Sequence, residues 1–322
     1  MAAELNPIFL DADKAREHLE SLLWPNGPIC PHCGNADPDR IAKLAGKAHR
    51  PGLYQCKECR DQFTVTVGTV FERSKIALNT WLYATFLLNS SKKGMSAHQL
   101  HRMLGVTYKT AWFMCHRIRE AMADAPGSVP PLGGEGKVIE ADETYFGKQE
   151  TQPKVRRDGQ PFTKGGRSGP SGKRAVVALV ERGGSVRSFH VEHATLDSVR
   201  EILVTNVSRK SVLHTDESRL YVRTGKEFAE HHTIVHSRNE YVRGSVHTNT
   251  IEGYFSIFKR GMKGVYQHCS EKHLHRYLAE FDFRYNHRTA LNWNDKERTD
   301  RALQKISGKR LTYRRTHEAA NA

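Results

Sequence analysis

The sequence lacks long hydrophobic runs, a secretory start and enough acidic residues to balance its basic ones. No apolar run approaches the roughly 20 residues needed to cross a bilayer, which excludes a membrane-spanning helix. The start, from Met1 to Pro7, has no basic region followed by an apolar stretch, so we expect a cytoplasmic protein. A length of 322 residues predicts two or three domains and excludes fibrous, collagenous and wholly disordered classes.

The shortage of acidic residues leaves a strongly basic chain. There are 50 Lys and Arg residues against 35 Asp and Glu, and the formal net charge is +15. Such an excess favours a polyanionic partner, because neutralising phosphates releases condensed counterions. Nucleic acid is the expected partner, and a basic protein without such a partner is the alternative from charge alone.

Four of the six cysteines form two Cys-x2-Cys pairs with 22 residues between them: Cys30, Cys33, Cys56 and Cys59. This spacing is typical of a site in which four thiolates hold a structural Zn²⁺. Two disulfides are the alternative, but a reducing compartment disfavours them. Because four thiolates complete the tetrahedron, the site is expected to stabilise a small zinc ribbon and to do no chemistry.

Helical spacing follows the ribbon over residues 75–123, where two helices are predicted to meet at a tight turn. Ser96 is placed to cap the first helix, Gly105 to allow the turn and Thr107 to cap the second. This pattern is typical of a helix-turn-helix, whose second helix enters the major groove with its N-terminal residues. Those residues are Tyr108, Lys109 and Thr110. A plain helical hairpin is the alternative.

A stretch rich in proline and glycine, residues 125–136, indicates a linker. Beyond it the pattern alternates between strand and helix. Strands are predicted at 137–146, 174–180, 186–191, 211–216 and 233–236, and helices at 196–207, 250–262 and 270–288. This order predicts an α/β domain in which helices cover a mixed sheet.

The segment from Thr151 to Arg174 separates the first two of these strands. It contains seven Lys or Arg residues, five glycines and a single aspartate. A segment this polar and rich in glycine is predicted to form a basic loop that follows a phosphate backbone, or simply a solvated surface loop.

Three acidic residues of the second domain are candidates for catalysis. Asp142 lies in the first predicted strand, Asp216 at the end of a later strand, and Glu252 near the start of a helix, with 35 residues between the last two. Brought together, these carboxylates could hold two divalent metals roughly 3.5–4 Å apart for an in-line phosphoryl transfer. Hard oxygen ligands favour Mg²⁺ or Mn²⁺ over zinc.

This arrangement of acids resembles the catalytic signature of DDE transposases and retroviral integrases. More narrowly, segments 139–147, 214–216 and 247–260, together with the zinc ribbon and the helix-turn-helix, resemble bacterial insertion-sequence transposases with an N-terminal zinc ribbon. The resemblance covers the chain from about Pro28 to Arg288. It implies an α/β fold with a ribonuclease-H-like mixed-sheet catalytic domain, preceded by the zinc ribbon and the helix-turn-helix.

The resemblance also implies roles for individual residues. Asp142, Asp216 and Glu252 would bind the catalytic Mg²⁺ or Mn²⁺. Basic residues on the helix of Glu252 would bind phosphate of the transposon end: Lys259, which lies seven residues on and shares the face of Glu252, Arg260 beside it, and Lys263 on the same stripe.

One residue offers an alternative to Glu252. In some members of the group an asparagine replaces the third acid, and Asn249 precedes Glu252 by three residues. Asn249 is therefore either the third metal ligand or a helix cap that forms a capping box with Glu252.

Further polar residues adjoin the acids: Glu140, Glu143, Glu217, His214 and His247. Glu140 shares a strand face with Asp142, whereas Glu143 points elsewhere in an ideal strand. We expect the glutamates to support the ligands or to lie on the surface. The histidines either orient a metal-bound water or contact DNA, or they make structural hydrogen bonds.

The predicted organisation is a zinc ribbon with an N-terminal helix at 1–74, the helix-turn-helix at 75–124, the linker at 125–136, the catalytic domain at 137–290 and a C-terminal basic tail at 291–322. The predicted function is a DNA transposase of the bacterial nucleoid that acts on double-stranded DNA of element ends and target, as a homodimer or higher synaptic complex. The alternatives are a catalytically inert DNA-binding regulator derived from a transposase, and a ribonuclease-H-like nuclease acting on RNA or junctions.

Overall fold

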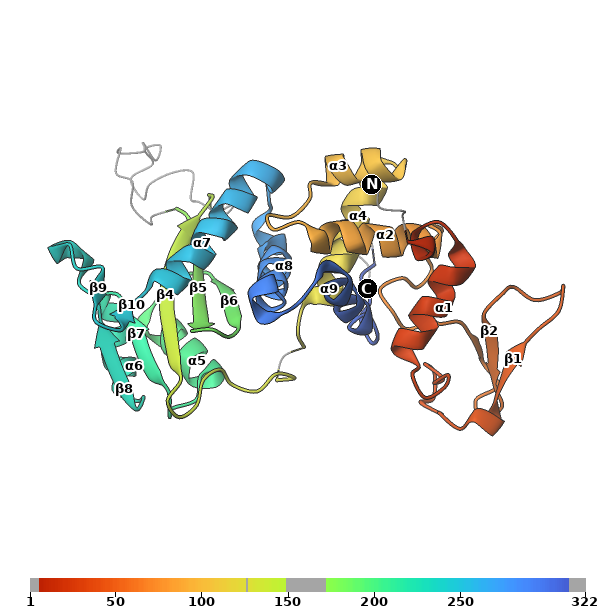
Figure 1. Ribbon diagram of the computed structural model, residues 1–322, viewed down its shortest axis with the longest axis horizontal. Coiled ribbons are helices and arrows are strands. Elements are labelled where there is room, and N and C mark those ends of the chain that lie inside the picture. Colours follow the sequence, from red (N-terminus) through yellow and green to blue (C-terminus); the bar gives the residue numbers. More distant parts are fainter. Residues whose placement is uncertain (1–5, 126, 149–171, 313–322) are drawn as a thin grey trace, which may run out of the picture. The chain divides into compact units, whose positions relative to one another are not determined.

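The computed structural model describes residues 6–125, 127–148 and 172–312, which belong to two compact units (Figure 1). One unit combines Met1–Ala123 with Asn292–Ala322, and the other is Asp124–Leu291. The chain therefore leaves the first unit, forms the second and returns to the first. Within the described ranges, no helix is both long and apolar enough to cross a membrane.

The first unit contains a small antiparallel sheet and a set of helices. The sheet has the order β1 (Ile41–Leu44), β2 (Leu53–Cys56) and β3 (Gln62–Phe63). The helices are α1 (Ala12–Leu23), α2 (Leu78–Ser90), α3 (Ala97–Leu104), α4 (Tyr108–Met122) and α9 (Asp295–Gln304). The sheet has a minimal core in which Trp24 meets the rings of Tyr54 and Phe63 edge-on, at centroid distances of 5.4 and 5.8 Å.

Helices α3 and α4 begin and end where the sequence predicts. The Ser96 hydroxyl accepts the Gln99 N–H at 3.1 Å, and Thr107 accepts the Thr110 N–H at 3.2 Å. Between them Gly105 has a φ of +65°, a left-handed conformation that glycine adopts without a steric penalty. These local signals produce the helix, tight turn and helix of the predicted motif.

Residues 292–312 are not the basic tail that we expected, because they contain α9 and its contacts with the first unit. Asp300 accepts a hydrogen bond from His18 at 2.8 Å, and the Arg298 guanidinium donates to the Asn89 carbonyl at 2.8 Å. Lys305 likewise donates to the Met122 carbonyl at 3.0 Å. The charged composition of α9 hid these contacts, because Arg298 and Asp300 bind partners that lie far away in the sequence.

The second unit is built on a five-stranded mixed sheet with the order β6-β5-β4-β7-β8. Its strands are β4 (Val138–Phe146), β5 (Arg174–Glu181), β6 (Val186–Val191), β7 (Val212–Thr215) and β8 (Glu230–Thr233). The first three pair antiparallel, whereas β7 pairs parallel with both β4 and β8. This strand order confirms the predicted ribonuclease-H-like mixed sheet.

Two details of this unit differ from the sequence prediction. The strand expected at 233–236 is β8 at Glu230–Thr233, and His236 already begins a 3₁₀ turn. Short elements without a hydrophobic pattern were not predicted: α6 (Arg219–Gly225), β9 (Val242–Arg243) and β10 (Val246–His247). Since β8 is a half-exposed edge strand of polar residues, its sequence carries little strand signal.

Helices cover both faces of the sheet (Figure 1). On one face Val176, Ala178 and Val180 of β5 pack against α7 (Asn249–Gly261) and α8 (Leu274–Asn286). On the other face the alternate residues of β4 and β5 pack against α5 (Leu196–Asn206) and α6. Because neighbours across the ladder share a face, Glu140 and Asp142 of β4, opposite Val180 and Ala178, lie on the α7 side.

A desolvated carboxylate ties α8 to β6 and α7. Asp282 accepts hydrogen bonds from the Ser188 N–H (2.8 Å), the Ser188 hydroxyl (2.7 Å) and the Tyr254 hydroxyl (2.5 Å). Burial nevertheless raises the pKa of Asp282 to about 7, because desolvation outweighs the three donors.

This raised pKa predicts a pH-dependent loss of stability. The folded state binds the proton of Asp282 more tightly than the unfolded state, whose pKa is about 3.9, so stability present in acid is lost as the pH rises through about 7. In Asp282→Asn the carbonyl can accept the Ser188 N–H, and the amide can donate to the two hydroxyls. We expect the unfolding free energy of the wild type to fall, relative to the variant, by on the order of 2 kcal/mol between about pH 5 and about pH 8. Urea titrations of both proteins measure this, and the same pH dependence in both would contradict it.

Candidate active site and nucleic-acid interface

The parallel pairing of β4 and β7 places Asp142 and Asp216 at the same level of the sheet. The ladder pairs Val138 with Val212 and Glu140 with His214. Continued by two residues, the same register puts Asp142 opposite Asp216, which follows the last residue of β7. Because the offset is constant, both aspartates emerge on the face that α7 covers.

The two aspartates lie in an environment that opposes negative charge. Burial raises the pKa of Asp142 well above its usual range, and the charges of Asp216, Glu143 and Glu252 raise it further. Burial is also the main reason that the pKa of Asp216 is raised. Among the described residues, each accepts one backbone N–H: Asp142 that of Glu143 at 2.7 Å, and Asp216 that of Ser218 at 3.0 Å. A proton or a cation is required to balance such a cluster.

Glu252 lies in the first turn of α7 and acts on the same cluster, since its charge contributes to the raised pKa of Asp142. Its side chain is 48% exposed. One carboxylate oxygen accepts the Thr248 hydroxyl at 2.9 Å and lies 3.6 Å from Nε2 of His236. The third acid is therefore close to the aspartates and open to solvent.

The predicted cap by Asn249 is wrong. Asn249 is exposed and is the first residue of α7, whereas the N-cap is Thr248, which makes no side-chain cap hydrogen bond. The N–H groups of Thr250 and Ile251 are instead bound by Glu140 of β4. A tertiary contact thus replaces the local capping box, and Asn249 remains only as the alternative third ligand.

The three carboxylates offer oxygen ligands of the kind that divalent cations prefer. In the described part of the chain, the ligand atoms of these acids do not form a set within 4.8 Å of one another, the spacing that would suit a single shared ion. Oxygen donors of this kind fit Mg²⁺ or Mn²⁺.

The neighbouring glutamates and His214 have structural partners. Glu143 accepts the Tyr221 hydroxyl at 2.7 Å, and Glu217 accepts the Ser237 hydroxyl at 2.9 Å. His214 is buried, and burial and then the charge of Arg182 lower its pKa to about 4. A neutral His214 with an Arg182 donor 3.2 Å from Nδ1 fits the structural alternative.

Arg182 contacts several residues of the site but was not singled out from the sequence. It follows β5, in the turn with Gly183 and Gly184, and forms an ion pair with Glu140 at 2.8 Å. Its position in a turn resembles that of many surface arginines, and no motif marks it. Only the fold brings it to its partners.

The four predicted zinc ligands come together in the first unit. The sulfur atoms of Cys30, Cys33, Cys56 and Cys59 all lie within 4.8 Å of one another. The Cys30–Cys59 and Cys33–Cys56 sulfur distances are 3.6 and 3.7 Å. A zinc tetrahedron with Zn–S bonds of 2.3 Å has edges of about 3.8 Å. The donor set and its spacing therefore fit a structural Zn²⁺.

Hydrogen bonds to its sulfur favour the thiolate form of Cys56, one of the four ligands. The backbone N–H of Cys59 is the largest of the effects that lower the pKa of the Cys56 thiol to about 6. The Asn35 side-chain amide adds a contact of 3.6 Å to the same sulfur. Both contacts favour the thiolate, which is the form that binds zinc.

The N-terminal residues of α4 are open to a partner. Tyr108 is 44% exposed and stacks on His98 with ring centroids 4.2 Å apart. Lys109 is also exposed, and Thr110 is half-buried. An exposed amphipathic ring, a cation and a hydroxyl at the start of a second helix are suited to groove contacts.

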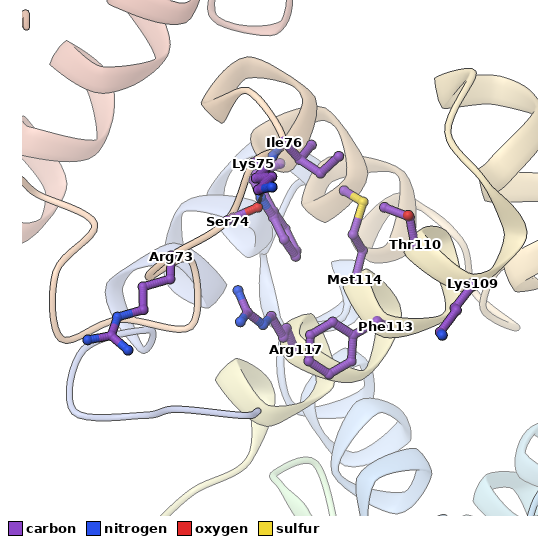
Figure 2. Close-up of a pocket in the computed structure, with 10 residues that line it drawn as sticks. Arg73, Ser74, Lys75, Ile76, Lys109, Thr110, Phe113, Met114 and Arg117 are labelled. Carbon is purple, nitrogen blue, oxygen red and sulfur yellow. Dashed lines mark hydrogen bonds between the residues drawn. The ribbon is translucent and has the colours of Figure 1, made fainter. Parts of the chain in front are cut away.

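A basic cavity of about 320 Å³ adjoins this end of α4 (Figure 2). Its walls come from the segment before α2, from Trp81 and from one face of α4: Arg73, Ser74, Lys75, Ile76, Lys109, Thr110, Phe113, Met114 and Arg117. The Arg117 guanidinium lies 4.9 Å from the Phe113 ring centroid and donates to the Glu72 carbonyl at 3.2 Å. Four cations line this cavity and no carboxylate does, so it favours an anionic group such as a phosphate.

The remaining predicted DNA contacts lie in or near α7 in the second unit. Lys259 is half-buried and Arg260 is exposed, both in the last turn of α7. Lys263 is exposed in a π-helical turn, Met262–Tyr266, that follows the helix. The predicted basic loop at 151–174 lies outside the described residues apart from its last three.

Two family models match the chain. One, described as an ISXO2-like transposase domain, matches residues 131–286, and one described as a transposase zinc-ribbon domain matches residues 10–62. A protein in transposable element ISH50 of Halobacterium salinarum, described as uncharacterized, is 30% identical over 283 residues. That match covers 86% of this chain and 91% of the relative.

Similarity to solved structures is weaker. The Mos1 transposase paired-end complex with the left transposon end is 13% identical, covers 70% of this chain and 74% of its own, and has a TM-score of 0.28. A pre-cleavage Mos1 transpososome is 13% identical, covers 92% and 89%, and has a TM-score of 0.27. The fold assignment therefore depends on the strand order and the family matches, not on these structures.

The cysteine cluster predicts that zinc removal unfolds the ribbon. We expect Cys56→Ser to bind substantially less than the roughly one zinc per chain that a four-thiolate site holds. The fluorescence of Trp24 should change with zinc loss, because its ring packs on Tyr54 and Phe63. Elemental analysis measures the zinc. Cys269→Ser, at a buried cysteine outside the cluster, is the control and should keep it. Full zinc in both variants would contradict the assignment.

Proposed function

Since the chain belongs to the ISXO2-like transposases that carry an N-terminal zinc ribbon, we propose that it binds the ends of an insertion element and catalyses their metal-dependent cleavage and transfer. The observation that carries this proposal is the level placement of Asp142 and Asp216 on adjacent parallel strands. Glu252 completes the set, because its charge reaches Asp142.

The first unit supplies recognition. The start of α4, with Tyr108, Lys109 and Thr110, reads the terminal repeat in the major groove. The cations of the adjoining cavity bind the backbone of the same DNA segment, which fixes the register of the helix on the duplex. Zinc holds the ribbon and performs no chemistry.

The second unit supplies the chemistry. Asp142, Asp216 and Glu252 would hold Mg²⁺ or Mn²⁺, which would supply activation of the attacking water or 3′-hydroxyl and stabilisation of the leaving oxygen. Burial, and secondarily the charge of nearby acids, raises the pKa values of both aspartates, and a bound cation would favour their charged forms. Lys259, seven residues beyond Glu252 on α7, binds a phosphate of the element end.

The substrate also suggests how the protein assembles. An element has two ends that are joined to one target, so a dimer or larger complex is required to hold both. The partners are then double-stranded DNA of the ends and of the target, in the bacterial nucleoid.

Removal of single carboxylates tests the catalytic assignment. We expect Asp142→Asn, Asp216→Asn and Glu252→Gln each to reduce cleavage and strand transfer by about 10³-fold or more, since a bound metal supplies several kcal/mol of transition-state stabilisation. The assay follows strand transfer of end-containing duplex with Mg²⁺ or Mn²⁺.

Two neighbouring residues provide matched controls for this assay. Glu217→Gln removes an exposed acid next to Asp216, and Asn249→Ala removes the alternative ligand at the first residue of α7. Both should retain activity within about threefold, because neither is assigned to the metals. Inactive Asn249→Ala with active Glu252→Gln would assign the third ligand to Asn249. Specific binding without cleavage by the wild type would favour an inert regulator.

The start of α4 predicts a salt-dependent contribution to DNA binding. We expect Lys109→Ala to weaken binding of end-containing duplex and to reduce the slope of log affinity against log salt by about 1, as for one lost phosphate contact. Lys296→Ala, on α9 and outside the cavity, makes the same charge change and should leave the slope unchanged. Equal slopes for all three proteins would contradict the assignment.

A further inference from the structure

A buried carboxylate on β4 caps the helix that carries Glu252. Glu140 is fully buried, and both of its oxygens are occupied by donors. Oε2 accepts the N–H groups of Thr250 at 2.9 Å and Ile251 at 3.0 Å, and Oε1 accepts the Thr250 hydroxyl at 2.8 Å. The first turn of α7 thus takes its cap from a residue 110 positions earlier in the chain.

Arg182 neutralises this carboxylate. Its Nε and Nη2 donate to Oε1 of Glu140 at 3.0 and 2.8 Å. The same guanidinium donates to the backbone carbonyls of Ser245 at 2.9 Å and His247 at 3.1 Å, in the segment that leads into α7. One arginine therefore holds both the cap and the approach to the helix.

The position of the cap couples it to the three acids. Glu140 precedes Asp142 by two residues and shares its strand face, while Ile251 directly precedes Glu252. The cap therefore joins the strand of the first acid to the helix turn of the third. The α7 N-terminus makes no side-chain cap of its own, so no local interaction duplicates this contact.

Glu140 is not itself a metal ligand in this arrangement. Five hydrogen bonds from protein donors occupy its two oxygens, and none of its surface is open to solvent. A bound cation would have to displace Arg182 or the α7 backbone. Glu140 must therefore affect the site indirectly, through the residues to which it is hydrogen-bonded.

We propose that Glu140, held by Arg182, is a positioning residue that sets where Glu252 stands relative to Asp142 and Asp216. The inference depends on the proposed function, because it assumes that these three acids bind the metals. In other helices a local side-chain cap fixes the first turn. Here the buried Glu140–Arg182 pair fixes the first turn of α7 and hence the distance of Glu252 from the two aspartates. Supporting residues of this kind typically change metal affinity or activity by 10–100-fold.

The test compares Glu140→Gln with a matched break of another buried ion pair. Glutamine keeps the size of Glu140 but turns one acceptor into a donor that faces the Thr250 and Ile251 N–H groups or Arg182. The control is Glu280→Gln on α8, which disrupts a fully buried glutamate bonded to Arg284 and Tyr266 in the same unit. The thermal midpoints of both variants separate a loss of stability from a displacement of Glu252.

Two readouts follow the site directly. Electron paramagnetic resonance measures Mn²⁺ binding, and cleavage of end-containing duplex is followed against Mn²⁺ concentration. We expect Glu140→Gln to weaken Mn²⁺ binding and to slow cleavage by about tenfold or more, with affinity for end DNA unchanged within about twofold. Arg182→Lys keeps the positive charge but loses the planar guanidinium. Its Mn²⁺ affinity and cleavage rate should lie between those of the wild type and Glu140→Gln. Glu280→Gln should keep its Mn²⁺ affinity within about threefold of that of the wild type, even if its thermal midpoint is lowered as much as that of Glu140→Gln.

The outcomes separate this inference from the proposed function. Wild-type Mn²⁺ binding in Glu140→Gln, or an equal loss in Glu280→Gln at the same thermal midpoint, overturns the positioning role. A wild-type protein that cleaves nothing overturns the proposed catalysis instead. In that case the Mn²⁺ titration still decides, because Asp142→Asn should abolish binding and Glu140→Gln should only weaken it.

Discussion

The parallel pairing of β4 with β7 is the contact on which the rest of the second unit depends. It places β4 at the centre of the sheet, between β5, which pairs with it antiparallel, and β7, which pairs with it parallel. It also fixes the register that makes Asp142 level with Asp216. A slip of one residue would turn one aspartate toward the α5 side of the sheet, into the cluster of Leu213 and Val177. The apolar residues between the polar ones therefore hold the site in register.

The α7 side of the sheet carries charge in a place where burial opposes it. Glu140 resolves this conflict within the fold, because Arg182 and the α7 backbone supply all of its partners. In the described part of the chain, Asp142 and Asp216 each accept one backbone N–H, and burial raises the pKa values of both. The buried charge of neighbouring carboxylates is thus compensated in different ways. Glu140 is saturated by protein donors, whereas Asp142 and Asp216 are the carboxylates that we propose as metal ligands.

The sequence predicts features that depend on nearby residues and misses those that depend on distant ones. Cysteine spacing, the Ser96 and Thr107 caps and the strand of Asp142 are local signals, and each is present in the structure. The spacing of three acids was enough to propose the site, because strand ends and a helix start constrain where carboxylates point. The cap of α7 was predicted locally from Asn249, but its actual partner is 110 residues away. Arg182 carried no pattern, since a turn arginine becomes informative only when its partners are known.

The first unit also depends on contacts between residues that lie far apart in the sequence. Helix α4, which begins with the candidate recognition residues, is held by Lys305 and Lys309 through the carbonyls of Met122 and Ala121. Arg117 of α4 likewise donates to the Leu311 carbonyl, 194 residues further on. These partners are synthesised after the entire second unit, so the first unit cannot complete its fold until the second unit has been made. Contacts of such long sequence separation cost loop entropy and are expected to form late. The helix that would read DNA therefore reaches its final packing only in a chain that also carries the three acids.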